Sequence, residues 1–192
     1  MRSLATLCLC LFLAPLAGAK TIVGDHIPQP RPKPVVEAAL HPATAPIVPP
    51  PIVATGLPVP RWVTVKAGRV NVRRGPSLDL EVLWTYVKPG VPVEITAEYD
   101  TWRRIRDVDG AVGWVKAAML DGRRNVMLTG RVNTAILDKP QADADAIAYG
   151  EPGLIAQLVA CGGEWCEIST RGYDGFVSRD RLWGVYENEV VK

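Results

Sequence analysis

Histidine is nearly absent from the sequence: its 192 residues include only two, His26 and His41. A serine or cysteine nucleophile usually depends on a histidine base, and a zinc ion needs three or four suitably spaced ligands. Both histidines lie in a proline-rich stretch that cannot form a compact core. The sequence also has no Walker loop, no C-x-x-C and no G-x-S-x-G motif. It therefore predicts a protein that is not an enzyme and carries no metal or cofactor.

An excess of charge of either sign is also missing. The chain has 22 basic and 20 acidic residues, a formal net charge of +2. Because nucleic-acid binding is driven by neutralisation of phosphates, this balance predicts no nucleic-acid partner. Long apolar runs are lacking as well, apart from the 13 residues from Leu4 to Leu16. That run is too short to span a bilayer comfortably.

The apolar run has the layout of a secretory signal peptide. Arg2 precedes it, and Ala17-Gly18-Ala19 follows it as a cleavage site. Cleavage removes residues 1–19, including Cys8 and Cys10, and leaves two cysteines in an exported chain. No later run approaches the length of a membrane helix, so no membrane span is predicted after cleavage.

Proline is concentrated in residues 20–60, which hold 11 of the 17 prolines. They form runs such as PQPRPKP (28–34) and IVPPPIV (47–53). Proline fixes its own φ and donates no backbone hydrogen bond, so we expect an extended, disordered linker. It acts either as a spacer or as a docking peptide in the polyproline II conformation.

Short strands and turns are predicted from Trp62 onward. VLWTYV (82–87), VPVEITAEY (91–99), WRRIR (102–106) and AVGWV (111–115) are separated by turn residues, as in a small barrel or sandwich. Strict alternation in 91–99 places Val91, Val93, Ile95, Ala97 and Tyr99 on one face and Pro92, Glu94, Thr96 and Glu98 on the other. KAAML (116–120) is long enough for a single helical turn only.

The second half of the chain repeats the first. GRVN occurs at 68–71 and 130–133, PG at 89–90 and 152–153, and GWV at 113–115 is matched by GFV at 175–177. Trp102 and Trp165 follow the PG glycines by 12 residues. Four features in the same order predict two tandem domains, residues 61–122 and a more divergent 123–186, followed by a tail at 187–192.

The first copy resembles the bacterial SH3-like domain family. The resemblance covers residues 62–120 and rests on Asn71, Val72, Arg73, Gly75, Pro76, Ser77, Gly90, Trp102, Gly113, Trp114 and Val115. The second copy reads NTAILDKP where the first reads NVRRGPS, so it lacks that arginine and the Gly-Pro-Ser turn. The resemblance implies two partly open barrels of five to six strands, the fold class all-β, and an envelope-binding role. The whole chain resembles exported tandem SH3-like proteins of Gram-negative bacteria, which implies a periplasmic rather than an extracellular location.

Aromatic and arginine side chains are the candidate binding residues. The aromatic candidates are Trp84, Tyr86, Tyr99 and Trp102, because flat rings suit sugars and extended peptides. We expect Trp114 in the core, and Tyr99 and Trp102 exposed beside a turn. Arg73, Arg104 and the neighbouring Arg74, Arg103 and Arg106 could bind carboxylates of a wall peptide. The alternative is that they form a solvated strand face paired with Glu94 and Glu98.

Three functions remain open, in this order. The first is a non-catalytic envelope module that recognises peptidoglycan or another cell-wall component. The second is an adaptor that binds an envelope protein, or the chain's own segment, through extended or proline-rich peptides. The third is a cell-wall hydrolase with an acid pair in a groove between the domains. The sequence does not indicate an oligomeric state.

The two cysteines of the exported chain lie in CGGEWC, residues 161–166. Val159-Ala160-Cys161 is predicted to end one strand, Gly162-Gly163 to turn, and Trp165-Cys166 to open the next. Export favours oxidation, and the lack of histidine argues against a metal site or a nucleophile. We therefore predict a Cys161–Cys166 disulfide, which would stabilise the second barrel by about 2 kcal/mol.

Overall fold

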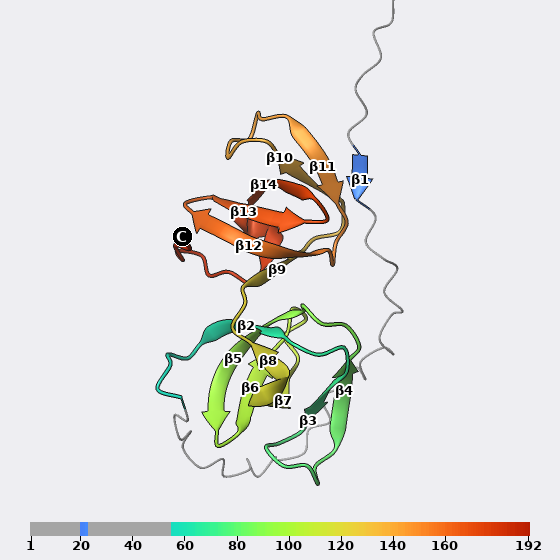
Figure 1. The fold of residues 1–192 in the computed structure, drawn as a ribbon, viewed down its shortest axis with the longest axis vertical. Helices are drawn as coiled ribbons and strands as arrows, with labels where there is room; N and C mark the ends of the chain where they lie inside the picture. Colours follow the sequence, from blue (N-terminus) through green and yellow to red (C-terminus); the bar gives the residue numbers. More distant parts are fainter. Residues whose placement is uncertain (1–19, 23–54) are drawn as a thin grey trace, which may run out of the picture.

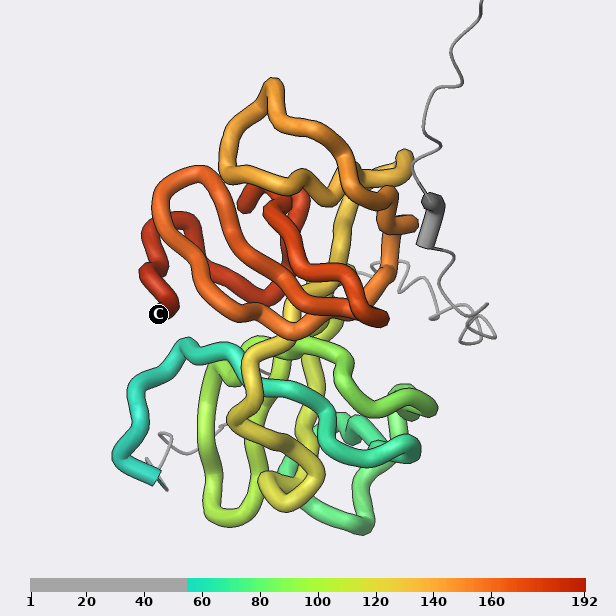
Figure 2. Tube along the Cα trace, turned by 45° about the horizontal axis from the view of Figure 1, so that its top comes forward, coloured from blue at the N-terminus to red at the C-terminus, as the bar shows by residue number. Residues whose placement is uncertain are grey.

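The computed structural model describes residues 20–22 and 55–192. Two β-barrels lie one above the other in Figure 1, and the turned view in Figure 2 shows the same arrangement. The predicted signal peptide and most of the predicted linker, residues 1–19 and 23–54, lie outside the described residues.

The first barrel is an antiparallel sheet of seven strands in the order β4-β3-β7-β6-β5-β2-β8. Its strands are β2 (Arg61–Val65), β3 (Val70–Arg73), β4 (Val82–Tyr86), β5 (Pro92–Tyr99), β6 (Trp102–Arg106), β7 (Val112–Lys116) and β8 (Leu120–Asp121). Eight buried aliphatic side chains make its core, among them Val72, Val93, Ile105 and Val115. The strands expected at 82–87, 91–99, 102–106 and 111–115 are confirmed.

The second barrel repeats this arrangement in the order β11-β10-β14-β13-β12-β9-β15. Its strands are β9 (Asn125–Leu128), β10 (Thr134–Leu137), β11 (Ala146–Gly150), β12 (Ile155–Gly162), β13 (Trp165–Thr170), β14 (Tyr173–Ser178) and β15 (Leu182–Trp183). Its separate core includes Val126, Ile136, Ile168 and Val177 together with both cysteines. The predicted fold class, all-β with two tandem SH3-like barrels, is confirmed.

Helical structure within residues 55–192 is limited to two single 3-10 turns, Ala117–Met119 and Arg179–Arg181. The first is the turn predicted at KAAML. Over the described ranges, no helix is long and apolar enough to cross a membrane.

A β-bulge in β5 changes which side chains face the core. Ile95 pairs with Ile105, but the register then shifts, so that Ala97 pairs with Arg104 and Glu98 with Arg103. Because Ile105 points inward and β6 alternates, Glu98 also points inward, and its side chain is 1% exposed. The expected strict alternation through Tyr99 is therefore wrong after Ile95, since the bulge adds one residue to β5.

The glycine of GWV and GFV allows β7 and β14 to approach a neighbouring strand closely. A Cβ added to Gly113 would lie 2.4 Å from Val72 Cγ1 and 3.1 Å from the Arg73 carbonyl oxygen. A Cβ on Gly175 would lie 2.7 Å from both Ile136 Cγ2 and the Leu137 carbonyl oxygen. Any larger residue would force these strands apart, which explains the glycine at both positions.

The two barrels contact each other through aromatic residues. Trp62 of β2 lies edge-to-face with Trp183 of β15, with ring centroids 4.6 Å apart, and lies 5.3 Å from Tyr186. The Trp183 indole N–H donates to the Pro92 carbonyl at 3.1 Å. The Asn125 amide donates to the Gly90 carbonyl at 2.9 Å. Directional contacts of this kind fix the position of one barrel on the other.

Both ends of the predicted linker contact a barrel. The strand β1 (Lys20–Ile22) pairs in parallel with β11, aligning Lys20 with Ala148 and Ile22 with Gly150. At the other end, Thr55 donates from its backbone and hydroxyl to Glu98. The predicted tail is attached too, because Val191 exchanges two backbone hydrogen bonds with Cys161.

Candidate functional site

The outer face of the first barrel carries a row of arginine and tryptophan across three strands. Arg104 of β6 is the direct partner of Trp114 of β7, and Trp114 is the direct partner of Arg73 of β3. Val82 of β4, the edge strand, is in turn the direct partner of Arg73, and it is 38% exposed. We call Arg104, Trp114, Arg73 and Val82 the arginine row. The strand register therefore places one arginine on each side of Trp114.

Arg104 is the arginine of this row that is available to a ligand. It is exposed, and among the described residues no carboxylate pairs with it. Arg73 is half-buried and donates to the Leu80 carbonyl at 2.6 Å, so it supports the loop that joins β3 to β4. Arg74 pairs with Glu81 on the surface. Since an exposed guanidinium binds a carboxylate in a bidentate manner, Arg104 gives this face a preference for anionic groups.

The predicted candidates Trp84 and Tyr86 pack against the core of the first barrel. Both are half-buried and pack against its aliphatic cluster. Their rings meet edge-to-face with centroids 6.3 Å apart. Burial, aided by the charge of Asp107, raises the pKa of the Tyr86 hydroxyl well above its usual value. These two residues therefore contribute to the packing of the core.

The expectation that Trp102 is exposed is wrong, because it is 4% exposed. The ammonium group of Lys116, its partner residue on β7, lies over the ring, 4.6 Å from the centroid. Tyr99, its direct partner on β5, is half-buried. Trp114 is 7% exposed, so its predicted burial is confirmed. Neither tryptophan offers a bare ring surface on which a sugar could stack.

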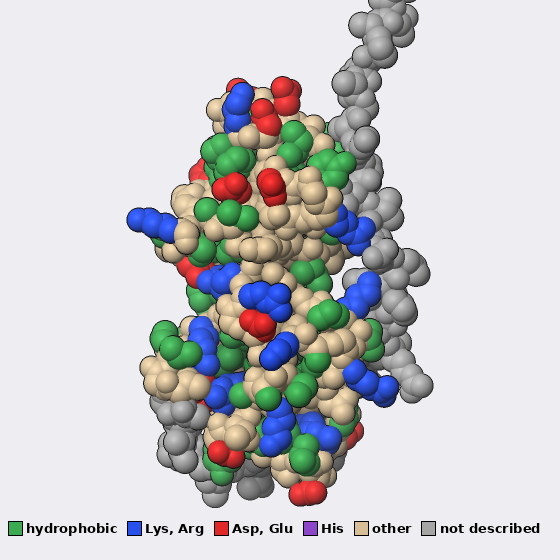
Figure 3. All heavy atoms as spheres, in the orientation of Figure 1, with side chains coloured by type: hydrophobic (Ala, Val, Ile, Leu, Met, Phe, Trp, Pro, Cys, Tyr) green, Lys and Arg blue, Asp and Glu red, His purple; other side chains and the backbone are tan. Residues whose placement is uncertain are grey.

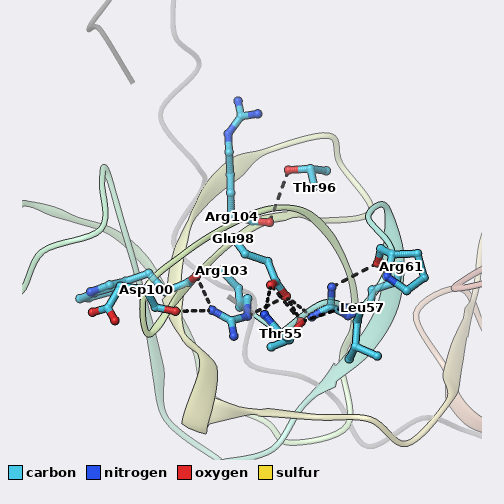
Figure 4. A network of polar contacts seen from close by, with 10 residues as sticks. Thr55, Leu57, Arg61, Thr96, Glu98, Asp100, Arg103 and Arg104 are labelled. Carbon is cyan, nitrogen blue, oxygen red and sulfur yellow. Dashed lines mark hydrogen bonds and ion pairs between the residues drawn. The ribbon is translucent and has the colours of Figure 1, made fainter. Parts of the chain in front are cut away.

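Glu98 is the centre of a polar network at one end of the first barrel (Figure 4). Arg61 and Arg103 both pair with its carboxylate, Arg103 at 3.1 Å, and Thr55 adds its hydroxyl and backbone N–H. Burial opposes ionisation of Glu98, but the hydrogen bonds from Arg61 and Thr55 outweigh it and hold its pKa below the usual range. The network joins residue 55 to the barrel.

Glu94 is buried at the contact between the barrels. It is 3% exposed and accepts from Arg106, whose Nε and Nη2 atoms lie 2.7 and 2.6 Å from one carboxylate oxygen. Arg106 also lies over Trp183, 5.6 Å from its ring centroid. The predicted pairing with Glu94 and Glu98 is therefore confirmed for Arg106 and Arg103. The expectation that this face is solvated is wrong, because both carboxylates are buried.

The second barrel lacks the arginine row. Arg73 pairs with Trp114 in the first barrel, and Leu137 pairs with Phe176 in the second. These two pairs are equivalent, because Arg73 and Leu137 each come directly after a register shift in their strand. The sequence alignment of NVRRGPS with NTAILDKP is thus displaced by two residues, since it would match Arg73 with Ala135. Glu167, the partner of Phe176 on β13, stands where Arg104 stands in the first barrel. The equivalent row is acidic and apolar.

Surface charge follows this difference between the barrels. On the face shown in Figure 3, lysine and arginine side chains gather over the first barrel and are sparser over the second. On this face, the first barrel therefore has more of the positive charge that attracts anions than the second.

Cys161 and Cys166 form a disulfide, as predicted, and are a directly opposed pair on β12 and β13. A groove of about 590 Å³ lies beside it on the second barrel. Its aromatic and apolar lining comes from Pro140, Trp165, Phe176, Val190 and Val191, and its acidic lining from Glu164 and Glu167. We call these seven residues the acidic-aromatic groove. The sequence did not predict this groove, because its walls come from loops, strands and the tail, which are far apart in the sequence.

Comparison with known proteins assigns the family. The Bacterial SH3 domain family matches the chain twice, at residues 66–122 and 131–184, which together exceed half of its length. The chain therefore belongs to the bacterial SH3 domain family, with two tandem copies of the domain. Proteins of this family are generally cell-wall-binding modules. The disulfide and the family are compatible with an exported protein.

Other comparisons add little. No curated protein matches the chain. Among solved structures, NlpC2 from Trichomonas vaginalis is 14% identical with a TM-score of 0.30 and coverage of 65% of this chain and 48% of that one. NlpC1 from the same organism is 13% identical with a TM-score of 0.31, covering 67% and 47%. The chain thus spans about half the length of these two proteins, and the likeness is too weak to assign a function.

Proposed function

We propose that the protein is a non-catalytic, exported module that binds peptidoglycan or another anionic cell-wall component in the periplasm. The observation that carries this proposal is the arginine row, in which the exposed Arg104 guanidinium has no carboxylate partner among residues 55–192. Cell-wall peptides end in carboxylates, which are the natural partners of such a group. The family supports a cell-wall role, and the predicted signal peptide supports export.

The geometry favours recognition of a charged peptide over recognition of a sugar. Trp102 and Trp114 are less than 10% exposed, so neither of these two rings is open for stacking beside the arginine row. Beside the arginine row, the Lys116 ammonium and the partly exposed Val112 extend the same face of β7. An extended peptide with a terminal or side-chain carboxylate could place its charge on Arg104 and its apolar part on Val82.

Co-sedimentation of the mature protein with purified sacculi tests this proposal. We expect the mature chain to sediment with sacculi, and Arg104→Glu to weaken binding at least tenfold, because a carboxylate would repel the ligand. Arg131→Glu is the matched control: it makes the same charge change at an exposed arginine of the second barrel and should leave binding unchanged. The proposal fails if the mature chain does not sediment, or if both variants behave alike.

The absence of catalysis is part of the same proposal. Incubation of the mature protein with sacculi should release no soluble muropeptides above a heat-inactivated control. Their release would instead support the hydrolase alternative.

A further inference from the structure

We propose that the acidic-aromatic groove of the second barrel is the docking site of the chain's own basic proline-rich segment, PQPRPKP at residues 28–34. This site is separate from the arginine row, and the inference does not rest on the proposed wall binding. Residues 28–34 lie outside the described residues, so the argument uses their sequence and the described groove.

The lining of the groove suits proline. Trp165 and Phe176 are half-buried, so part of each ring is open, and Pro140 and the 66% exposed Val190 extend the apolar wall. Proline-rich peptides in the polyproline II conformation bind to grooves lined with aromatic rings because they lose little conformational freedom on binding. The groove differs in this from the first barrel, where Trp102, the residue in the position of Trp165, is 4% exposed and lies beneath the Lys116 ammonium group.

The charge of the groove suits arginine and lysine. Neither Glu164 nor Glu167 is paired with a cation among the described residues. Arg179, which lines the adjoining hollow, donates instead to the carbonyls of Gly163, Tyr186 and Glu189. Two more carboxylates, Asp180 and Glu187, line that hollow. Arg31 and Lys33 of the segment alternate with prolines and would meet these acidic groups.

The chain can bring the segment to the groove. The strand β1 holds Lys20–Ile22 on β11 of the same barrel, and only five residues separate Ile22 from Pro28. In the sheet order β1-β11-β10-β14, Phe176 lies three strand spacings from β1, or about 14 Å. Residues 28–34 begin about 20 Å of extended chain after β1 and end about 40 Å after it. A tethered segment within such reach has a high effective concentration at the groove.

Titration with a synthetic PQPRPKP peptide, followed by NMR, tests the proposal. The peptide is added to the mature chain and to a variant in which residues 28–34 are replaced by a Gly-Ser sequence of equal length. In the variant, we expect the peptide to shift the Trp165 indole and Phe176 resonances. In the unaltered chain, the tethered segment should compete and weaken the apparent affinity at least tenfold.

Two controls locate the contacts. A PQPQPQP peptide, without the cations, should bind at least tenfold more weakly to the variant. Glu164→Lys, an exposed substitution that should not disturb folding, should weaken PQPRPKP binding similarly, whereas Asp79→Asn on the first barrel should not. None of these groove changes should alter sedimentation with sacculi, which separates this inference from the proposed function.

Three results would overturn the inference. In the first, the peptide fails to bind the Gly-Ser variant. In the second, the variant and the unaltered chain bind it with equal affinity. In the third, competition in the unaltered chain depends on protein concentration, which would assign the groove to the segment of a second copy.

Discussion

A single buried carboxylate, that of Glu98, holds together several residues of the first barrel. Glu98 is one of its few buried charges, and it is satisfied by two guanidinium groups and a threonine. Removing one member of a buried ion pair leaves the others uncompensated, which costs more than losing a surface pair.

Replacing Glu98 by glutamine should therefore destabilise the protein by about 3 kcal/mol at pH 7. The exposed pair of Arg74 and Glu81 provides the control, because Glu81→Gln should change stability by about 0.5 kcal/mol or less. Urea unfolding of both variants measures the difference. Equal effects of the two substitutions would contradict the assigned role of Glu98.

The pKa of Glu98 also predicts a pH dependence. Because the folded-state pKa lies below the usual value of about 4.3, ionised Glu98 stabilises the fold at pH values above that value. This stabilisation is lost as the pH falls through the lower, folded-state pKa. Acid unfolding of Glu98→Gln should therefore show a smaller loss of stability between pH 5 and the acid transition than the unaltered protein.

The sequence predicts strands and turns better than it predicts contacts between distant residues. Alternating apolar residues, turn glycines and the repeated GWV and GFV motifs are local signals, and they located β4 to β7 and the second copy. The bulge in β5 could not be predicted, because it depends on how Ile95 and Ala97 pair with another strand. Its consequence, an inward Glu98, was missed for the same reason. The exposure of Trp102 was also misjudged, because Lys116 comes from the next strand.

Because β7 lies close to β3, we predict that position 113 does not tolerate a residue larger than glycine. Gly113→Ala should destabilise the protein by about 2 kcal/mol, since the added methyl group would overlap the Val72 side chain. Gly122→Ala is the matched control, because no heavy atom lies within 4 Å of a Cβ at that position. Thermal unfolding of the two variants should differ clearly, and indistinguishable midpoints would show that β7 can move away from β3 at no cost.

The whole molecule depends on the contact between the barrels, which sequence did not predict. Trp62 and Trp183 are 121 positions apart in the numbering, and nothing in their local patterns marks them as partners. Pairing between repeats requires knowledge of how the two copies are oriented. The sequence did not predict the acidic-aromatic groove for a related reason: the tail is held beside it by long-range contacts, such as the bridge between Val191 and Cys161 and the ion pair between Arg124 and Glu189.

Trp183→Ala should separate the unfolding of the two barrels. We expect the mature protein to unfold in one calorimetric transition, because the indole of Trp183 contacts Trp62 and donates to Pro92. Without it the less stable barrel should unfold first, giving two transitions and a loss of about 3 kcal/mol for that barrel. Trp165→Ala, a half-buried tryptophan away from the contact, should retain a single transition. One transition in both variants would show that other contacts couple the barrels.

The aromatic contact between the barrels has a consequence for bivalent binding. Two domains on a flexible tether search for their targets independently, and their combined affinity depends on tether length. Here the edge-to-face contact between Trp62 and Trp183 sets the separation and orientation of the two outer surfaces. A target that binds both barrels at once therefore gains avidity only if the spacing of its two binding groups matches the fixed spacing of the barrels. A target whose groups are closer together or farther apart gains none.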